Sequence, residues 1–345
     1  MQEHELDALL VTHLPNIRYL CGFTGSAGIL AIEHGRARFF TDGRYTQQAR
    51  DEVHGVKVEI TSSNMASATA WLSAKRSGRK IGIESNHITV SERNNLRRLL
   101  PKGCKLSDTP APIEQLRLVK DAAEISRIRA ACRLGIQLFS RLLKNIRGGA
   151  VESEIAAELE YEARRAGAEQ MAFSSIVAGG KRSSFPHARA SFHPLPARGF
   201  VVCDFGVILA GYCSDMTRTL HVGSPTRQMR EGYIAVLEAQ QAAISAVNPG
   251  TTVGEVDETA RKLLKEKNLA RFFTHSTGHG LGLEIHELPR VAAGQKQLLR
   301  PGMVITIEPG IYLPGKWGVR IEDTVVVTER GCEVLTECSK ELITV

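Results

Sequence analysis

Short apolar runs alternate with polar turns over the first hundred residues of the chain. The pattern predicts strands at residues 8–11, 28–32, 37–41, 56–60 and 80–83, with a turn at residues 14–16 and a glycine hairpin at residues 33–36. Residues 91–100 form a helical pattern that ends at Pro101. Because strands and helices alternate, we expect a compact α/β domain here.

The rest of the chain has longer helical patterns between fully apolar strands. Helices are predicted after an Asp121 cap with Glu124 three residues on, and at residues 152–166, 227–247 and 253–267. Strands are predicted at residues 200–204, 303–308 and 319–327. We therefore expect an α+β domain in which helices cover one face of a mostly antiparallel sheet. The proline-rich segment 108–112 is the expected linker, dividing the chain into domains 1–112 and 113–345.

Four carboxylates stand at the ends of apolar strand runs. Asp204 begins the sequence Asp-Phe-Gly and the chain returns to Asp215, whereas Glu308 begins Glu-Pro-Gly and the chain returns to Glu322. The shared order of carboxylate, any residue, glycine, loop and second carboxylate predicts two similar hairpins related by a pseudo-twofold axis.

Carboxylates in such positions are partly buried, and several of them close together repel unless a cation lies between them. Two divalent ions provide that charge. An imidazole is available from His275, His279 or His286, which lie within twelve residues among glycines. Oxygen ligands with one imidazole suit Mn, Co, Fe or Zn.

A simpler interpretation needs no metal. Asp204 and Glu308 would cap turns beside their glycines, while Asp215 would pair with Arg218 and Glu322 with Arg320. Two matched hairpins favour the metal interpretation over this one.

Composition narrows the class of protein. The 345 residues are 43% hydrophobic and 23% charged, as in folded globular proteins, and no run is long enough and apolar enough for a membrane helix. The net charge of +7 is spread along the chain and aromatics make up only 6%, so we expect no nucleic-acid partner. Seven scattered cysteines without a C-x-x-C motif, and no signal peptide pattern at residues 1–7, predict a cytoplasmic protein with reduced thiols.

Four segments of the second domain together resemble the pita-bread metallopeptidases, which include aminopeptidase P, prolidase and methionine aminopeptidase. They are the stretches from Asp204 to Thr219, from His275 to Glu287, from Gly302 to Tyr312 and from Gly318 to Asp323. Residues 22–28 and 41–49 resemble the creatinase-type amino-terminal domain of Xaa-Pro aminopeptidases. The resemblance covers essentially the whole chain and implies an α/β amino-terminal domain followed by a pita-bread catalytic domain.

The resemblance implies a set of five ligand residues for two divalent ions. The expected ion is Mn, with Co or Zn as alternatives. Asp204 would bind one ion, Asp215 and Glu322 would bridge both, and His279 and Glu308 would bind the other. A water between two cations becomes a nucleophile near neutral pH.

The resemblance also implies roles on the substrate side. Glu308 would accept the proton of the nucleophilic water and pass it to the departing nitrogen. His187 would steady the scissile carbonyl, and His286 would face the residue after the bond. His275 and Arg320 would lie beside the ligands or the substrate. Relatives are usually homodimers, and we expect one here.

The expected activity is hydrolysis of the N-terminal Xaa-Pro bond of peptides with proline at the second position, as in aminopeptidase P. The alternative is a dipeptidase, prolidase, whose pocket beyond proline is closed by a group that recognises a free carboxylate. A metal-free creatinase-like hydrolase and a non-enzymatic binding module on the same fold are further alternatives. Both predict substitutions at the ligand positions, all of which are intact here.

Overall fold

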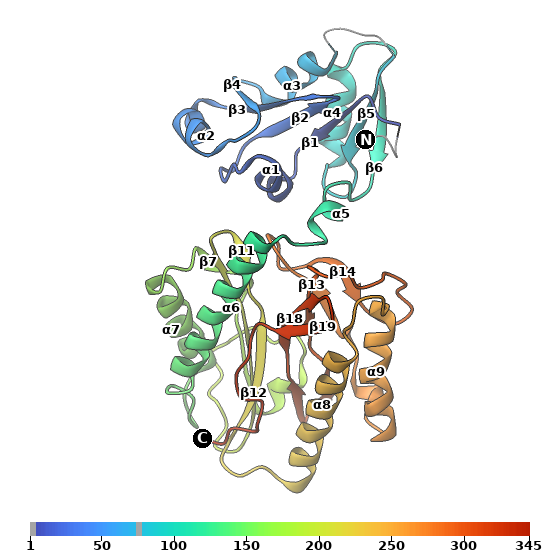
Figure 1. The fold of residues 1–345 in the computed structure, drawn as a ribbon. Coiled ribbons are helices and arrows are strands. Elements are labelled where there is room, and N and C mark those ends of the chain that lie inside the picture. The colour runs from blue at the N-terminus through green and yellow to red at the C-terminus, as the bar shows by residue number, and fades with distance from the viewer. Residues whose placement is uncertain (1–4, 74–77) are drawn as a thin grey trace. The chain divides into compact units, whose positions relative to one another are not determined.

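A computed structural model describes residues 5–73 and 78–345, so most of the opening segment searched for a signal peptide lies outside it. The chain forms two compact units, Met1–Arg117 and Leu118–Val345 (Figure 1). Each unit has hydrophobic clusters of its own. The two units are therefore considered one at a time.

The first unit is built on a mixed six-stranded sheet with the order β4-β3-β2-β1-β5-β6. Its strands are β1 (Ala8–Val11), β2 (Ile29–Glu33), β3 (Arg36–Thr41), β4 (Lys57–Ile60), β5 (Lys80–Glu84) and β6 (Lys105–Thr109). Its helices are α1 (Leu14–Cys21), α2 (Thr46–Glu52), α3 (Asn64–Ser73), α4 (Val90–Leu99) and α5 (Glu114–Arg117). Strand β1 pairs antiparallel with β2 and parallel with β5, which confirms the predicted α/β class.

Two local predictions in this unit are wrong. Residues 14–16 begin helix α1 rather than a turn, because a proline in the first helical turn needs no N–H partner. Asp108 and Thr109 belong to β6, which pairs in parallel with β5, so the predicted linker is shorter than residues 108–112. Helix α5 follows and stays with the first unit, because Glu114 accepts a hydrogen bond from Asn16.

The second unit contains short strands and four long helices. The helices are α6 (Ala122–Leu142), α7 (Glu152–Arg165), α8 (Arg227–Ser245) and α9 (Val253–Glu266), with 3-10 turns η3 (Gly180–Ser184) and η4 (Ala270–Phe272). The first strands are β7 (Gln170–Met171), β8 (Ile176–Gly179), β9 (Gly199–Phe205), β10 (Val207–Leu209), β11 (Tyr212–Cys213) and β12 (Met216–Val222). The later ones are β13 (Gly278–Gly280), β14 (Glu287–Val291), β15 (Val304–Ile307), β16 (Gly310–Leu313), β17 (Trp317–Arg320), β18 (Asp323–Thr328) and β19 (Gly331–Val334).

The two predicted hairpins are present and share one plan. Strands β9 and β12 pair antiparallel, with β10 and β11 inserted between them as a small hairpin. Strands β15 and β18 pair antiparallel in the same way, with β16 and β17 inserted between them. The prediction of one continuous strand at residues 319–327 is wrong, because the chain breaks at Ile321 and Glu322 to pass from β17 to β18.

Helices cover these sheets and bury their apolar faces. Helix α6 lies against α7 and the β10–β11 hairpin, and α8 lies beside α9 and against β15 to β17 (Figure 1). The predicted capping box of α6 is present, since Asp121 accepts from the backbone of Glu124 and the reverse bond also forms. The mixture of helices and mainly antiparallel strands confirms the predicted α+β class of this unit.

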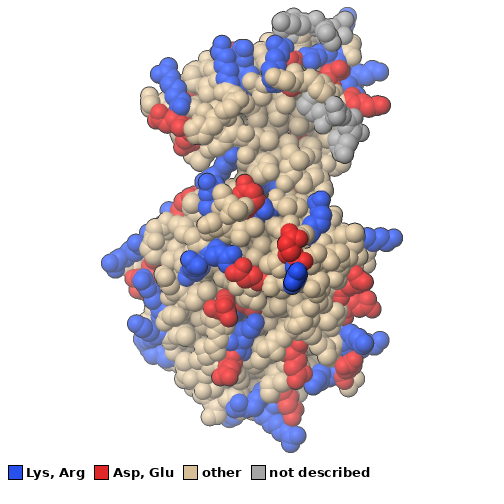
Figure 2. All heavy atoms as spheres, in the orientation of Figure 1, with Lys and Arg blue, Asp and Glu red and all other residues tan. Residues whose placement is uncertain are grey.

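The surface and the helices add two observations. On the face drawn in Figure 2, lysine and arginine side chains are interspersed with aspartate and glutamate rather than gathered in one basic stretch. No helix in the described ranges, 5–73 and 78–345, combines the length and the apolarity needed to cross a membrane.

Candidate metal centre

The predicted ligands lie at the ends of the paired strands. Asp204 is the second-last residue of β9, and Asp215 immediately precedes β12. Glu308 immediately follows β15, and Glu322 immediately precedes β18. His279 lies on β13, which pairs antiparallel with β15. The repeated hairpin plan therefore delivers the carboxylates as two pairs, and β13 adds the imidazole.

Distances show that four of these side chains converge, and the charge of the fifth, Asp204, acts on all three of the other carboxylates. His279 Nε2 lies 3.6 Å from Asp215 Oδ2 and 3.4 Å from Glu308 Oε1. Asp215, His279 and Glu322 each offer a ligand atom, and these atoms lie within 4.8 Å of one another. His279 Nδ1 lies 3.0 Å from the carbonyl oxygen of Gly280, which assigns the ring proton to Nδ1. The lone pair of Nε2 is thus left to bind a cation among the carboxylates.

Burial shifts the pKa of four groups in this cluster toward the neutral form, namely Asp215, His279, Glu308 and Glu322. Asp215 and Glu322 are 4% and 1% exposed, and burial, reinforced by the neighbouring carboxylates, raises the pKa of both well above the usual range. Burial raises the pKa of Glu308 to about 8 and lowers the pKa of His279 to about 4. A cation at the cluster would favour the ionised carboxylates and the neutral imidazole that ligation requires.

Two carboxylate oxygens show that the cluster fits metal ions. Asp204 Oδ1 and Asp215 Oδ1 are buried and have no hydrogen-bond partner among the described residues. Buried polar atoms in native structures are almost always paired, so such atoms call for a ligand. Oxygen donors with one imidazole nitrogen suit divalent ions such as Mn, Co and Zn. The residues present therefore fit the pair of divalent ions that the sequence predicts.

The metal-free interpretation of the carboxylates does not agree with the ion pairs. Arg320 Nη2 pairs with Asp204 rather than with Glu322. Arg218 Nη2 lies 2.8 Å from Asp323 Oδ1 rather than pairing with Asp215. Among the described residues, the carboxylates of Asp215 and Glu322 thus form no ion pair with an arginine.

Two threonines that sequence reasoning missed hold the ligands. Thr217 Oγ1 donates to Glu322 Oε2 at 2.6 Å. Thr306 Oγ1 lies 3.3 Å from Glu308 Oε1 and accepts a hydrogen bond from the backbone of His279. Thr306 is the one polar residue of β15, and such an isolated hydroxyl is the signal that could have identified it, whereas Thr217 lies among other polar residues of β12. Their hydrogen bonds fix the orientation of the two carboxylates that they contact.

Both ring nitrogens of His275 are engaged in hydrogen bonds beside the ligands. Its Nε2 lies 2.9 Å from Tyr312 Oη, and its Nδ1 lies 2.8 Å from the carbonyl oxygen of Ser276. Tyr312 Oη in turn accepts from Arg320 Nη1 at 2.6 Å. Burial lowers the pKa of His275 to about 4, so the ring is neutral. His275 is thus connected to Asp204 through Tyr312 and Arg320, with both of its nitrogens engaged.

The other two predicted histidines border the same centre. The ring of His286 lies 4.5 Å from that of His279, centroid to centroid, and nearly perpendicular to it. His187 is exposed, and Arg320 Nη1 lies 3.0 Å from the carbonyl oxygen of the preceding residue, Pro186. Burial, followed by the charge of His187, lowers the pKa of His286. Both histidines are therefore accessible at the edge of the carboxylate cluster.

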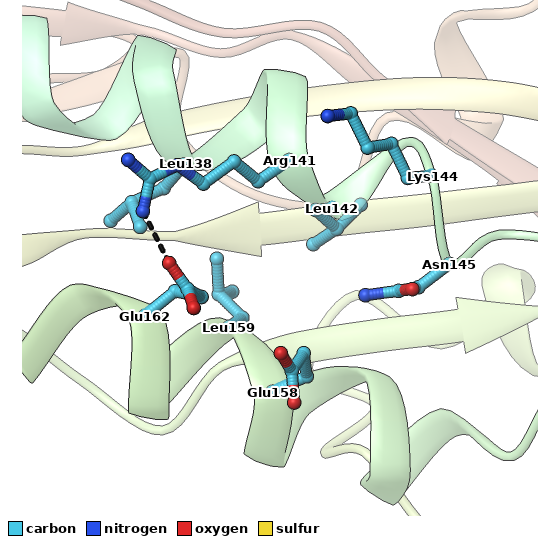
Figure 3. Close-up of a pocket in the computed structure, with 8 residues that line it drawn as sticks. All are labelled: Leu138, Arg141, Leu142, Lys144, Asn145, Glu158, Leu159 and Glu162. Atoms are coloured by element: carbon cyan, nitrogen blue, oxygen red, sulfur yellow. Dashed lines mark hydrogen bonds and ion pairs between the residues drawn. The ribbon is translucent and has the colours of Figure 1, made fainter. Parts of the chain in front are cut away.

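A hollow elsewhere in the second unit has different chemistry. It lies between α6 and α7, has a volume of about 310 Å³, and is crossed by the ion pair of Arg141 with Glu162 (Figure 3). None of the predicted ligands or histidines lines it. The hollow is open and is lined by side chains of both charges, unlike the buried carboxylate cluster. The cluster therefore remains the candidate reaction site.

Comparisons with known proteins identify the family of the chain. Residues 126–329 match metallopeptidase family M24, and residues 1–119 match the creatinase/prolidase N-terminal domain. The Xaa-Pro dipeptidase of Pyrococcus horikoshii is 36% identical over 344 residues, which are 99% of this chain and 96% of that protein.

Solved structures give the same result. The Xaa-Pro dipeptidase from Bacillus anthracis has a TM-score of 0.96 and 38% identity, with 100% of this chain and 96% of that chain covered. The X-Pro aminopeptidase from Thermotoga maritima has a TM-score of 0.90 and 36% identity, with 100% and 99% covered. The predicted pita-bread fold is thereby confirmed. The chain belongs to metallopeptidase family M24, and it carries the creatinase/prolidase N-terminal domain ahead of the catalytic unit.

Proposed function

We propose that this protein is an Xaa-Pro dipeptidase that hydrolyses the single peptide bond of dipeptides ending in proline. The convergence of three carboxylates, Asp215, Glu308 and Glu322, with the imidazole of His279 on one buried site is the observation that carries the peptidase chemistry. The sequence-based expectation of an aminopeptidase takes second place, because the relatives named Xaa-Pro dipeptidase favour the alternative.

The proposed ligands are the five residues of the cluster. Asp204 would hold one ion, His279 and Glu308 would hold the other, and Asp215 and Glu322 would be shared between them. Two divalent ions held there supply Lewis acidity and a water nucleophile at neutral pH. Thr217 and Thr306 fix the orientation of the carboxylates of Glu322 and Glu308, which would hold the ions. We propose Mn²⁺ as the native ion and a homodimer as the assembled state, both on the family resemblance.

The remaining residues handle the proton and the substrate. Glu308, whose pKa burial raises to about 8 in the metal-free protein, would accept the proton of the nucleophilic water and deliver it to the proline nitrogen. His187 donates a hydrogen bond to the scissile carbonyl oxygen, and His286 faces the proline side. Arg320 binds both Asp204 and the carbonyl oxygen of Pro186, which keeps the residue before His187 linked to a proposed metal ligand.

Arg290 is a candidate for recognising the free carboxylate of a dipeptide. It stands directly opposite His279 in the β13–β14 pair, so the two side chains leave the sheet on the same face. Arg290 is exposed, and its guanidinium has no hydrogen bond or ion pair within the described part of the chain. An arginine can bind a carboxylate through two parallel hydrogen bonds. This placement favours a substrate whose carboxylate follows proline directly.

A second candidate function is Xaa-Pro aminopeptidase. The likeness to the Thermotoga maritima X-Pro aminopeptidase, at 36% identity over the full chain, is the observation that favours it. In that case the space beyond proline accepts further residues, and Arg290 contributes little to binding.

The two functions are separated by initial rates on Ala-Pro and Ala-Pro-Ala, with Mn²⁺ and with EDTA. We expect a Mn²⁺-dependent rate that is at least tenfold higher on Ala-Pro. Replacement of Arg290 by alanine should raise KM for Ala-Pro by about 10- to 100-fold, which corresponds to the loss of a charge-assisted bond of about 1.5–3 kcal/mol. Arg330→Ala, at an exposed turn, is the matched control. A faster rate on the tripeptide, unchanged by Arg290→Ala, would identify an aminopeptidase instead.

A further inference from the structure

Glu152 is a buried carboxylate far from the metal ligands in sequence. It is the first residue of α7 and is only 1% exposed. Its Oε1 accepts from the backbone N–H of Gly179 at 2.9 Å. Its Oε2 accepts from Arg182 Nε at 2.9 Å and from Ser191 Oγ at 2.7 Å, with the backbone N–H of Ser191 at 3.2 Å. One side chain thus binds two segments that are separated along the chain.

These partners stand at the two ends of one loop, residues 180–191, which we call the His187 loop. Gly179 and Arg182 lie at its beginning, and Ser191 lies at its end. The loop is closed further by Arg182 Nη2, which donates to the carbonyl oxygen of Arg189 at 2.7 Å. Glu152 binds both ends of the loop, and the bond from Arg182 to Arg189 adds a second link across it. The Glu152 carboxylate therefore fixes the distance between the two ends of the loop.

The middle of the His187 loop lies at the metal centre. The carbonyl oxygen of Pro186 accepts from Arg320 Nη1, and Arg320 pairs with Asp204. His187 follows directly, and its side chain is exposed toward solvent rather than bound within the core. The position of this imidazole therefore depends on how the loop is held at its ends, and Glu152 is the group that holds both.

We propose that Glu152 is a positioning residue for His187, acting through the ends of the His187 loop without contacting the substrate. This inference rests on the proposed function for the role of His187 in catalysis. The inference assigns a role to helix α7, whose first residue holds the loop that connects strands β8 and β9.

The substitution Glu152→Gln tests the proposal with little change in shape. The amide places an NH₂ donor where two N–H groups, a hydroxyl and a guanidinium now donate, so at least one buried donor loses its acceptor. We expect kcat/KM for Ala-Pro to fall about tenfold, while the content of bound Mn²⁺ stays at the wild-type level. Glu158→Gln, at an exposed position on the same helix (Figure 3), is the matched control.

A double-mutant cycle shows whether the effect passes through His187. In a His187→Ala background, Glu152→Gln should lower kcat/KM less than twofold, because the group that it positions is gone. An equal fold-loss in both backgrounds would show a general structural role and overturn the proposal. If Glu152→Gln does not yield folded protein, Arg182→Gln enters the same cycle with the same expected pattern.

Hydrogen exchange gives a readout that does not depend on peptidase activity. We expect the backbone amides of residue 185 and of residues 187–190 to exchange at least tenfold faster in Glu152→Gln than in the wild type, with little change in the strands of the sheet. Unchanged exchange in this loop would overturn the positioning role whatever the substrate is. Faster exchange with no cleavage of any Xaa-Pro peptide by the wild type would instead reject the proposed function and leave Glu152 as the residue that holds the loop.

Discussion

At the scale of single residues, burial favours the protonated form of the carboxylates in the metal-free centre. Glu308 has a pKa of about 8 in the folded protein against an ordinary value of 4.5. Between those values the folded, metal-free protein binds a proton that the unfolded chain has released, so its stability falls as the pH rises through this window. Divalent ions remove that cost by pairing with the ionised carboxylates. We therefore predict that Mn²⁺ raises the melting temperature more at pH 8 than at pH 5, measured by calorimetry against an EDTA-treated sample.

The variant Glu308→Gln serves as the control for this pH dependence. It cannot ionise, so the stability of the metal-free variant should fall less between pH 5 and pH 8 than that of the wild type. Because Asp215 and Glu322 also have raised pKa values, some dependence should remain. A gain from Mn²⁺ that is the same at both pH values would contradict the assignment of the protons to this cluster.

At the scale of elements, the approach of β13 to β15 determines where His279 lies. A Cβ on Gly278 would overlap the carbonyl oxygen of Thr306, which is backbone and cannot turn aside. We therefore predict that Gly278→Ala forces the strands apart, costs about 1–3 kcal/mol of folding free energy, and weakens ion binding by moving the imidazole. The variant Gly43→Ala, where an added Cβ meets nothing within 4 Å, is the control. Metal content after dialysis and the melting temperature measure both effects, and full retention of two ions would contradict the prediction.

Local patterns predicted these elements where their determinants are local. The hairpin of β2 and β3 and the capping box of α6 depend on neighbouring residues, and both are present. The break at Ile321 and Glu322 was not predictable from the apolar run around it, because it arises from β17 and β18 joining different sheets.

The candidate site also combines features that the sequence predicts with features that only the fold reveals. Its carboxylates are visible in the sequence as charges at strand ends, and the family resemblance adds His279. The pairing of Arg320 with Asp204 joins residues 116 positions apart and follows only from the fold. The clamp of Glu152 on both ends of the His187 loop is equally non-local, since the carboxylate belongs to a helix that looks ordinary in sequence.

At the scale of the whole molecule, two units with separate cores share one chain, and all the candidate ligands belong to the second. The core of the first unit gathers around residues such as Phe39 and Leu10, and that of the second around Phe200 and Val236. Ion binding stabilises only the unit whose folded form contains the site, unless the two units unfold together. The effect of metal removal thus measures how far the two cores are coupled.

The two tryptophans of the chain allow this measurement, because Trp71 lies on α3 in the first unit and Trp317 on β17 in the second. In Trp71→Phe, fluorescence reports the second unit, and we predict that EDTA lowers its melting temperature by several degrees, since a loss of 1 kcal/mol shifts a unit of this size by about 2–4 °C. In Trp317→Phe, fluorescence reports the first unit, whose transition should move by less than about 1 °C. Trp317 is 7% exposed, so its replacement lowers the starting stability of the second unit, and each variant is compared with its own Mn²⁺-loaded form. Equal shifts at both tryptophans would show that the cores unfold as one, and a shift at Trp71 alone would place the ions outside the carboxylate cluster.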